Sequence, residues 1–341
     1  MRNFGDFLEK PVADLAGPLM GAELHAADTL TAGSRIGPYR VIRELGRGGM
    51  GVVCLAERVD GTPGAPVALK VVQRRFAVEP ASLRRFREER EILAPLAHPG
   101  IAGLQDGGVE PDGTPWFAME YVDGIPIDRY CTTHSLDVPA RLELFARACD
   151  AVEHAHRLSI VHRDIKPSHI LVTADREVKL LDFGIAKLAA PDGAMGGGAY
   201  DPTFTQPQLL TPAYASPEQL RGDRVSTASD VYALGVLLYK LLTGRTPARR
   251  AADVVRGAKP LTYENPPSLG PDLPAPLNDI TTRALQPEMH RRFQTGGELA
   301  AAVRAYLSGA PGHGRSLGER VAGILASMRR LLGISRRGQT H

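Results

Sequence analysis

The stretch that decides the fold reads IVHRDIKPSHILV at residues 160–172, and KLLDFG follows it at residues 179–184. Asp164 lies in the middle of the first segment, and Asp182 closes a short apolar strand-like run in the second. An isolated Asp-Phe-Gly carries little information. The two segments in this order and at this distance are a highly specific combination of motifs. The residues before and after them are therefore interpreted by their position relative to these segments.

Toward the N-terminus, a glycine-rich segment lies between two strand-like runs and has the pattern G-x-G-x-x-G-x-V, with Gly46, Gly48, Gly51 and Val53 at the fixed positions. Missing side chains let a backbone approach phosphate groups closely. A dinucleotide-binding Rossmann unit needs a helix directly after its glycines, whereas here a strand-like run follows. The context favours a phosphate-binding hairpin, and the alternative is an ordinary glycine-rich turn.

The next strand-like run ends in Lys70, whose ammonium could reach the phosphates of a bound nucleotide. After it, residues 81–98 repeat apolar side chains at helical spacing, and Glu89 lies on the same stripe as Phe86 and Leu93. A carboxylate on an apolar face needs a partner of opposite charge. We therefore predict an ion pair between Lys70 and Glu89, the alternative being an ordinary surface pair.

Together these motifs resemble the signature set of protein kinases, from about Tyr39 to Leu307. A lysine two residues after Asp164 resembles the serine/threonine branch, and the run SPEQ at residues 216–219 resembles the bacterial eukaryotic-like (Hanks-type) members. The resemblance implies an α+β, two-lobed fold, with an antiparallel N-terminal sheet carrying one main helix and a mostly helical C-terminal lobe. The patterns agree, because strand-like runs come first and helical ones dominate after Asp123.

By this resemblance the chain transfers the γ-phosphoryl group of ATP to serine or threonine hydroxyls of proteins, with Mg²⁺ as a cofactor. Asp164 is expected to accept the hydroxyl proton, and Lys166 to stabilise charge on the transferring group. Asp182 is expected to hold Mg²⁺, which prefers oxygen ligands, with Phe183 packed beneath it. Lys70 and Glu89 complete the expected catalytic set.

Residues 116–122 resemble the strand and hinge that hold adenine in this family. Met119 is expected to gate the back of the adenine site, and backbone groups of Glu120 and Val122 to contact the base. Val53 and Ala68 complete the expected nucleotide-binding set. An ordinary hydrophobic strand is the alternative.

One position departs from the family pattern. His169 stands where the family has an asparagine whose side-chain carbonyl holds a second Mg²⁺ and braces the catalytic loop. Imidazole is a poor Mg²⁺ ligand. Three interpretations stay open: a kinase of reduced activity or altered metal preference, favouring Mn²⁺; full activity through one metal; and a nucleotide-binding pseudokinase scaffold. Because Lys70, Asp164 and Asp182 are all intact, the enzyme comes first.

Residues 211–218, TPAYASPE, resemble the end of an activation segment. Glu218 is expected to pair with Arg292, and Asp230 to anchor the catalytic loop from the core of the helical lobe. Surface charges in loops are the alternative.

Thr203 and Thr205 lie earlier in this segment, where we expect autophosphorylation. Phosphate on either could pair with Arg163 and order the segment. Thr211 is expected to contact Asp164 and Lys166 as part of the substrate platform.

Composition excludes several other classes. The 41 basic and 38 acidic residues leave a net charge of only +3, which provides no general attraction to nucleic acid. Cys54, Cys131 and Cys149 are widely spaced, so neither a disulfide framework nor a zinc site is expected. No secretory signal or bilayer-spanning run is apparent. We expect a cytoplasmic protein.

The expected organisation is an N-terminal extension at 1–36, a kinase domain at 37–307 with lobes at about 37–120 and 124–307, a Gly/Pro linker at 308–318 and a basic amphipathic tail at 319–341. From Arg315 onward there are six arginines and one glutamate, with apolar residues on one helical face. The tail could lie on the inner face of the membrane, bind an acidic partner, or dock on its own kinase domain.

Overall fold

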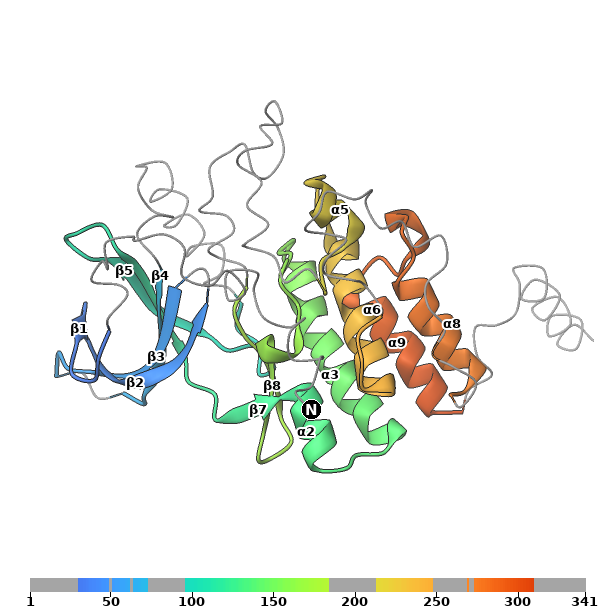
Figure 1. Ribbon diagram of the computed structural model, residues 1–341, viewed down its shortest axis with the longest axis horizontal. Coiled ribbons are helices and arrows are strands. Elements are labelled where there is room, and N and C mark those ends of the chain that lie inside the picture. The colour runs from blue at the N-terminus through green and yellow to red at the C-terminus, as the bar shows by residue number, and fades with distance from the viewer. Residues whose placement is uncertain are drawn as a thin grey trace, which may run out of the picture.

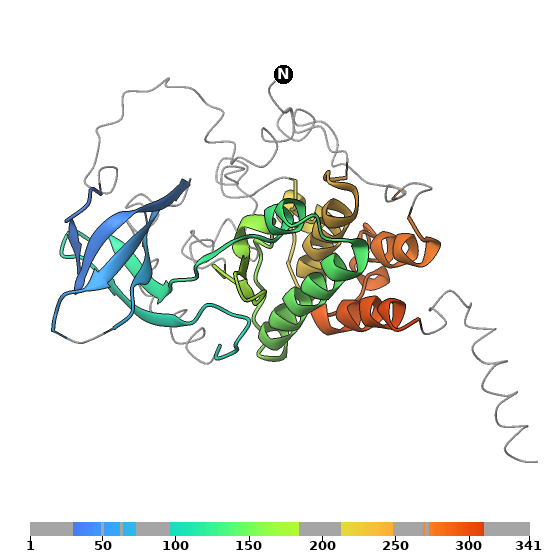
Figure 2. The same ribbon diagram turned by 90° about the horizontal axis from the view of Figure 1, so that it is seen from below.

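The computed structural model describes residues 30–48, 51–61, 64–72, 96–183, 213–247, 269 and 273–309. Within them a sheet-rich part and a helix-rich part lie side by side (Figures 1 and 2). The expected α+β, two-lobed architecture is confirmed. The predicted helix that carries Glu89, the three activation-segment threonines and the basic tail lie outside the described residues.

In the described part of the N-terminal lobe, six strands form one sheet in the order β1-β2-β3-β4-β6-β5, and every neighbouring pair is antiparallel. The strand-like runs on either side of the glycine-rich segment, and the run that contains Lys70, are strands in the structure. Because β1 also pairs with β2, the sheet begins two residues before the boundary expected at residue 37. The bounds are β1 Arg35–Ile36, β2 Tyr39–Gly48, β3 Gly51–Arg58, β4 Val67–Val72, β5 Leu104–Val109 and β6 Pro115–Glu120.

The two faces of this sheet have different roles because side chains alternate along each strand. One face forms a small core around Tyr39 and Trp116, to which β3 and β4 contribute Val52, Cys54, Ala56, Val67, Leu69 and Val71. The opposite face carries Val53 beside Lys70 and Ala68 beside Met119, since these are cross-strand partners. Residues expected to hold a nucleotide therefore share one face.

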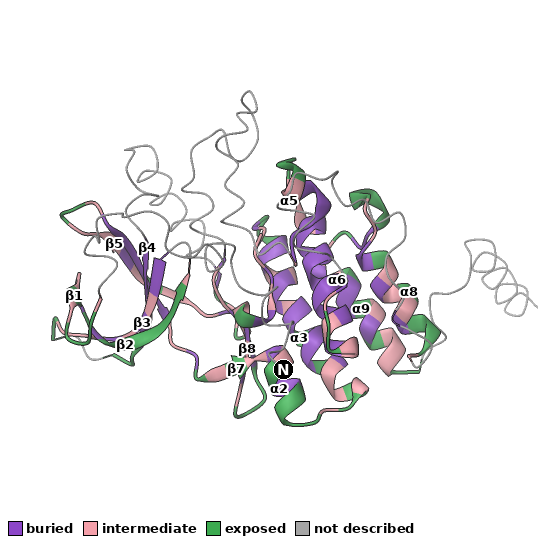
Figure 3. Cartoon of the chain, in the orientation of Figure 1, coloured by how far each residue is buried: buried purple, intermediate pink, exposed green. Residues whose placement is uncertain are grey.

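The C-terminal lobe is built on α3 and α6, which pack against each other and against α9. Asp137 caps α3 by accepting from the N–H of Ala140, and Gly244 ends α6 with a φ of 76°. Most of α6 is buried (Figure 3), as its all-round apolar sequence predicts. The helices are α2 Ile127–Thr133, α3 Val138–Arg157, α5 Pro217–Arg221, α6 Thr227–Thr243, α8 Ala275–Ala284 and α9 Gly296–Leu307.

Short elements on the side of this lobe nearer the sheet carry parts of the two segments that decided the fold (Figure 1). They are β7 Gly124–Pro126, the 3₁₀ turn η4 Pro167–His169, β8 Ile170–Thr173 and β9 Val178–Leu180, and a further 3₁₀ turn, η6 Met289–Arg291, precedes α9. The three strands form one antiparallel sheet in the order β7-β8-β9. Residues 160–172 therefore run from the end of α3 into β8, and β9 leads directly to Asp182.

The loop before β5 fastens β9 to the N-terminal part of the chain. Leu180 donates its N–H to the carbonyl of Gly100 at 2.8 Å and accepts from Ala102 at 2.9 Å. Phe117 of β6 is buried in the same core cluster as the helices of the C-terminal lobe. These contacts fix the position of Asp182 relative to the sheet. In the described part of the chain, no helix has the length and apolar character that crossing a membrane requires.

Candidate active site

A buried carboxylate holds the loop that contains Asp164. Asp230, on α6, is 1% exposed and accepts from the backbone N–H of His162 at 2.7 Å and of Arg163 at 2.8 Å. The imidazole Nε2 of His156 lies 3.0 Å from the same carboxylate. The anchoring contact expected of Asp230 is thus present, and it fixes the backbone directly before Asp164.

Asp164 and Lys166 form a close pair on this loop. The Lys166 ammonium lies 3.1 Å from Oδ2 of Asp164, and the two side chains are 19% and 13% exposed. A carboxylate that is shielded yet reachable can accept a proton from an incoming hydroxyl. The neighbouring cation is suitably placed to balance negative charge that develops on a transferring group.

Asp182 is paired with Lys70 from β4, Nζ to Oδ1, at 2.6 Å. Burial alone would raise the pKa of the Asp182 carboxyl, but the Lys70 ammonium reverses this effect and holds the pKa below its ordinary value. The Asp182 carboxyl is therefore ionised at neutral pH. The predicted partner of Lys70, Glu89, lies outside the described residues.

The segment around Asp182 is tied to the catalytic loop on both sides. Leu181 donates its N–H to the carbonyl of His169 at 2.8 Å, and the Leu181 carbonyl lies 2.8 Å from Nε2 of His162. The rings of His162 and Phe183 lie 4.8 Å apart between centroids. Phe183 therefore packs against the buried histidine that precedes the Arg163-Asp164 pair.

His169 points its ring toward the same loop. Its Nδ1 lies 2.8 Å from the backbone carbonyl of Asp164 and 3.5 Å from the Asp164 Oδ2. Burial, followed by the Lys166 ammonium, lowers the pKa of His169 to about 3. The imidazole is consequently neutral at physiological pH.

The glycine-rich hairpin connects β2 and β3, where Gly46, Gly48 and Gly51 lie as predicted. Gly51 has a φ of +155°, and a Cβ at this position would meet the carbonyl oxygen of Val71 at 2.0 Å. Only glycine allows β3 and β4 to approach this closely. Gly46 and Gly48 differ, because a Cβ at either position would meet nothing within 4 Å.

The strand β6 carries the expected adenine-binding residues. Met119 is largely buried and pairs across the sheet with Ala68, while Val122 is buried just after the strand. The side chain of Glu120 forms an ion pair with Lys179 of β9 at 2.6 Å, a contact that the sequence motifs did not suggest. The end of β6 is therefore held to the strand that leads to Asp182.

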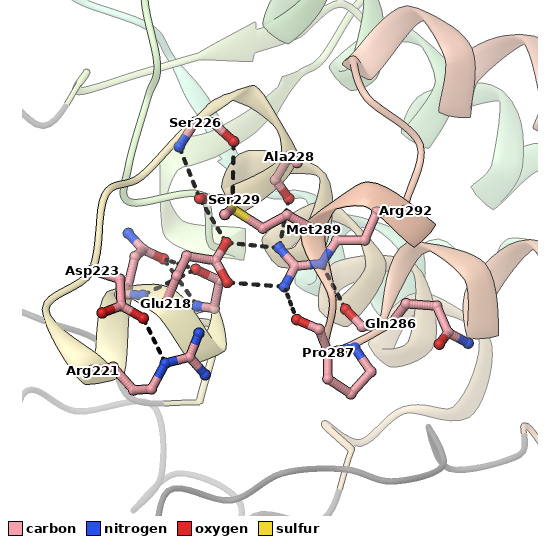
Figure 4. Close-up of polar contacts among 12 residues, drawn as sticks. Glu218, Arg221, Asp223, Ser226, Ala228, Ser229, Gln286, Pro287, Met289 and Arg292 are labelled. Carbon is pink, nitrogen blue, oxygen red and sulfur yellow. Dashed lines mark hydrogen bonds and ion pairs between the residues drawn. The ribbon is translucent and has the colours of Figure 1, made fainter.

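Glu218 and Arg292 form the expected ion pair, in which both side chains are 0% exposed (Figure 4). Arg292 donates to both carboxylate oxygens, at 2.7 and 2.9 Å, and Ser229 donates to Oε1 at 2.7 Å. The next residue, Gln219, donates from Nε2 to the carbonyl of Arg163 at 2.8 Å. The helix α5 therefore connects the end of the expected activation segment to the catalytic loop.

Comparison with known proteins decides the family. The model of the protein kinase domain matches residues 39–299. The chain belongs to the protein kinase family.

Serine/threonine-protein kinases of bacteria are among its relatives. The probable serine/threonine-protein kinase SCO3848 of Streptomyces coelicolor is 35% identical over 84% of this chain and 42% of its own length. PknA and PknB of Mycobacterium tuberculosis are each 37% identical over 80% of this chain, and over 62% and 43% of their own lengths. The chain thus spans about half the length of these relatives. The expected resemblance to bacterial Hanks-type kinases is confirmed.

A solved structure agrees with the fold of this kinase. The crystal structure of the Mycobacterium tuberculosis PknI kinase domain has a TM-score of 0.63 and 32% identity, and the match covers 82% of this chain and all of that one.

The kinase site fits one Mg²⁺ better than two. In the described part of the chain there is no group of three or more His, Cys, Asp and Glu side chains that could hold a metal ion. Asp182 supplies the ionised oxygen that Mg²⁺ prefers, whereas His169 supplies a neutral imidazole, which suits Mg²⁺ poorly. Nucleotide phosphates would have to provide most of the remaining ligands.

Several residues of the kinase core did not follow from the sequence motifs. His156 and Gln219 reach the catalytic loop from α3 and α5, and Lys179 reaches the end of β6. His162 and Lys179 lie within the two segments that decided the fold, and this position was the only sequence feature that could have indicated their contacts in the site. His156 precedes those segments on a helix, where a histidine gives no specific signal.

Proposed function

We propose that the chain is a serine/threonine protein kinase that transfers the γ-phosphoryl group of ATP to protein hydroxyls. The observation that carries the proposal is the convergence of two ion pairs, Lys166 with Asp164 and Lys70 with Asp182, on loops that hydrogen bonds join to each other. The named activity of the bacterial relatives supports it. Protein chains are the proposed substrates, and nucleic acid is not.

In this mechanism the side chains position groups and balance charge. Asp164 orients a substrate hydroxyl and takes its proton as the oxygen bonds to the γ-phosphorus and the bond to the departing ADP breaks. Lys166 offsets negative charge on the transferring group. Lys70 binds the non-transferred phosphates, with Glu89 as its proposed partner. Asp182 would hold Mg²⁺, which when bound neutralises phosphate charge.

The nucleotide is proposed to lie against the sheet face that carries Val53, Ala68 and Met119. These side chains offer an apolar surface for adenine, and backbone groups of Glu120 and Val122 offer hydrogen bonds at its edge. The hairpin of Gly46, Gly48 and Gly51 covers the phosphates.

Regulation is proposed to act through the activation segment. Phosphate on Thr203 or Thr205, added by the kinase itself, would pair with Arg163, whose backbone is already fixed by Asp230 and Gln219. Thr211 would contact Asp164 and Lys166 beside the bound peptide. Mass spectrometry of the active protein tests this, and an active protein with neither Thr203 nor Thr205 modified would exclude it.

The cysteines and the basic tail support a proposal on where the kinase is located and what its tail contacts. We place the kinase in the cytoplasm, where its three buried free thiols, Cys54, Cys131 and Cys149, stay reduced. The basic tail at 319–341 would then be available to an anionic membrane surface or to an acidic partner. Co-sedimentation with anionic liposomes, with and without residues 315–341, tests the membrane contact.

Transfer of labelled phosphate tests the proposed function. The purified chain is incubated with γ-labelled ATP and a generic basic protein, in Mg²⁺ and in Mn²⁺, with Asp164→Asn as the control. We expect incorporation that the control loses. The rival function is a nucleotide-binding pseudokinase scaffold, which His169 keeps open. It would be supported by tight ATP binding without transfer in either metal, even after His169→Asn.

A further inference from the structure

The side chain of His98 shapes the loop that precedes β5. The backbone N–H of Gly100 donates to Nδ1 of His98 at 3.0 Å. A backbone N–H can only donate, so Nδ1 is the acceptor and carries no proton in this arrangement. The N–H of Ile101 donates to the His98 carbonyl at 2.9 Å and closes the same turn. This conformation of the loop therefore requires a neutral His98.

The loop contacts both β9 and α3. The Gly100 carbonyl accepts from the N–H of Leu180 at 2.8 Å, and Leu180 lies two residues before Asp182. On the other side, the His98 ring packs on the ring of His154 of α3, with 4.8 Å between the centroids and 30° between the planes. The loop thus connects α3 to the strand that leads to Asp182.

The surroundings of His98 disfavour a positive charge. Burial, followed by the neighbouring His154, lowers the pKa of His98 below its ordinary value. Asp150 of α3 acts in the opposite direction, and the ammonium of Lys179 on β9 lowers the pKa further. Protonation of His98 therefore works against the packing of this loop.

The charged groups near the two rings are already paired with each other. Lys179 forms its ion pair with Glu120 at 2.6 Å, and Asp150 pairs with Arg304. Nε2 of His154 is buried and has no hydrogen-bond partner among the residues that the structure describes. In that part of the chain, no carboxylate is hydrogen-bonded to either ring and ready to stabilise a proton.

We propose that the contact between His98 and His154 is a proton-sensitive connection that positions Asp182. With His98 neutral, its ring accepts from Gly100 and the loop holds β9. A proton on Nδ1 places two donors face to face, so the hydrogen bond to Gly100 breaks, and it adds a positive charge beside His154 and Lys179. The loop then releases β9, and Asp182 loses its fixed position.

The direction of the pH effect follows from proton linkage. The released loop binds the proton more tightly than the packed loop, because the pKa of His98 returns toward its ordinary value of 6.5 on release. The packed loop is therefore favoured above this pH and is lost as the pH falls below it. One proton takes part, so the released fraction should rise several-fold, and by about tenfold at most, from pH ~7.5 to pH ~5.5.

Hydrogen exchange followed by mass spectrometry tests this connection without phosphate transfer. The full chain is measured over that pH range, with rates corrected for the intrinsic effect of pH. Peptides that cover residues 96–103 and 178–183 report opening of the loop, and a peptide from α6 reports global unfolding. In the wild type, protection of the first two peptides relative to α6 should fall several-fold on acidification.

His98→Asn separates this histidine from other titrating groups. The asparagine Oδ1 can also accept from the N–H two residues on, but the amide does not titrate. Relative protection in this variant should stay constant with pH. The matched control is His290→Asn, an exposed histidine on η6, which should behave as the wild type. Constant protection in the wild type, or a fall that persists in His98→Asn, overturns the inference.

Phosphate transfer gives the functional readout. Between pH ~7.5 and pH ~6, His98→Asn should keep a larger share of its kcat than the wild type, because its loop still holds β9. Identical pH profiles of the two proteins would overturn the link to Asp182. Absence of transfer at every pH would count against the proposed function instead, and the exchange result would still decide this inference.

Discussion

Replacing Arg292 by methionine tests how the helical lobe holds the end of the activation segment. Arg292 is fully buried and donates to both oxygens of Glu218 and to the carbonyls of Ala228, Pro287 and Gln286 (Figure 4). Methionine fills a similar volume but donates nothing. The substitution leaves a buried carboxylate whose remaining described side-chain partner is Ser229.

The magnitude follows from this uncompensated charge. Removing one partner of a buried ion pair costs about 3–5 kcal/mol in the free energy of unfolding. For a domain of this size the melting temperature should fall by roughly 6–20 °C. The effect should be visible as a shift of the urea midpoint, followed by circular dichroism.

The loss should also depend on pH. In the wild type, burial would raise the pKa of the Glu218 carboxyl, but Arg292 outweighs burial and holds the pKa below its ordinary value. This carboxylate therefore stabilises the fold above the unfolded-state pKa, and the stabilisation is lost as pH falls through the lower folded-state pKa. In Arg292→Met only hydrogen bonds from Ser229 and from the Glu218 backbone oppose burial, so the pKa of the Glu218 carboxyl should rise and protonation relieves the unpaired charge. The difference between wild type and variant should shrink from pH ~8 to pH ~4.5.

The matched control is Arg304→Met on α9. Arg304 pairs with Asp150, and the two side chains are 49% and 40% exposed. An exposed pair contributes about 0–1 kcal/mol, so this variant should stay close to the wild type. The reasoning is refuted if Arg292→Met loses no more stability than Arg304→Met at neutral pH.

Three further predictions concern the site itself. Asp230→Asn replaces the carboxylate that three donors contact by an amide and so displaces the loop that carries Asp164. We expect kcat to fall by about 10²-fold, while the nucleotide Kd, measured by calorimetry, stays unchanged. An unchanged kcat would exclude the anchoring role. Gly51→Ala should destabilise the fold by more than about 1 kcal/mol, whereas Gly46→Ala, where a Cβ has open space, should leave the melting temperature unchanged; equal melting temperatures for the two variants would contradict the steric argument. The pKa of His169 is lowered from 6.5 to about 3 in the folded protein. Below neutral pH the unfolded chain therefore binds a proton at this residue that the folded chain does not bind, so the free energy of unfolding decreases as the pH is lowered. Between pH ~7 and pH ~5 this effect lowers the free energy of unfolding of the wild type by about 2 kcal/mol. In urea titrations without metal, the loss of stability over this pH range should be smaller by that amount in His169→Asn. Equal losses in the wild type and the variant would contradict the buried neutral imidazole.

The sequence predicted the parts of the fold that local patterns determine. Strands β2, β3 and β4 follow from alternating and β-rich runs, and α6 follows from its continuous apolar sequence. The pairing of Glu218 with Arg292 followed from the resemblance, because their separation along the chain carries no pairing signal of its own.

Ion pairs between charged residues that lie far apart in the sequence could not be predicted from the sequence alone. Glu120 and Lys179 look like ordinary solvated residues in the sequence, and their ion pair exists because the loop at Gly100 fastens β9 to the N-terminal lobe. The ion pair between Lys240 of α6 and Asp128 of α2, at 2.9 Å, could not be predicted from the sequence either. At His169 the residue type alone raised the question of the metal, but the hydrogen bond to Asp164 was needed to assign the proton to one nitrogen.

The central claim is that this chain transfers phosphate to protein hydroxyls using Asp164. The most direct measurement mixes wild-type protein with a tagged Asp164→Asn copy and γ-labelled ATP, then identifies labelled amino acids in the tagged copy and in a basic test protein. We predict phosphoserine or phosphothreonine that appears only when the wild type is present. Absence of label from both proteins, in Mg²⁺ and in Mn²⁺ and despite measured ATP binding, would contradict the account.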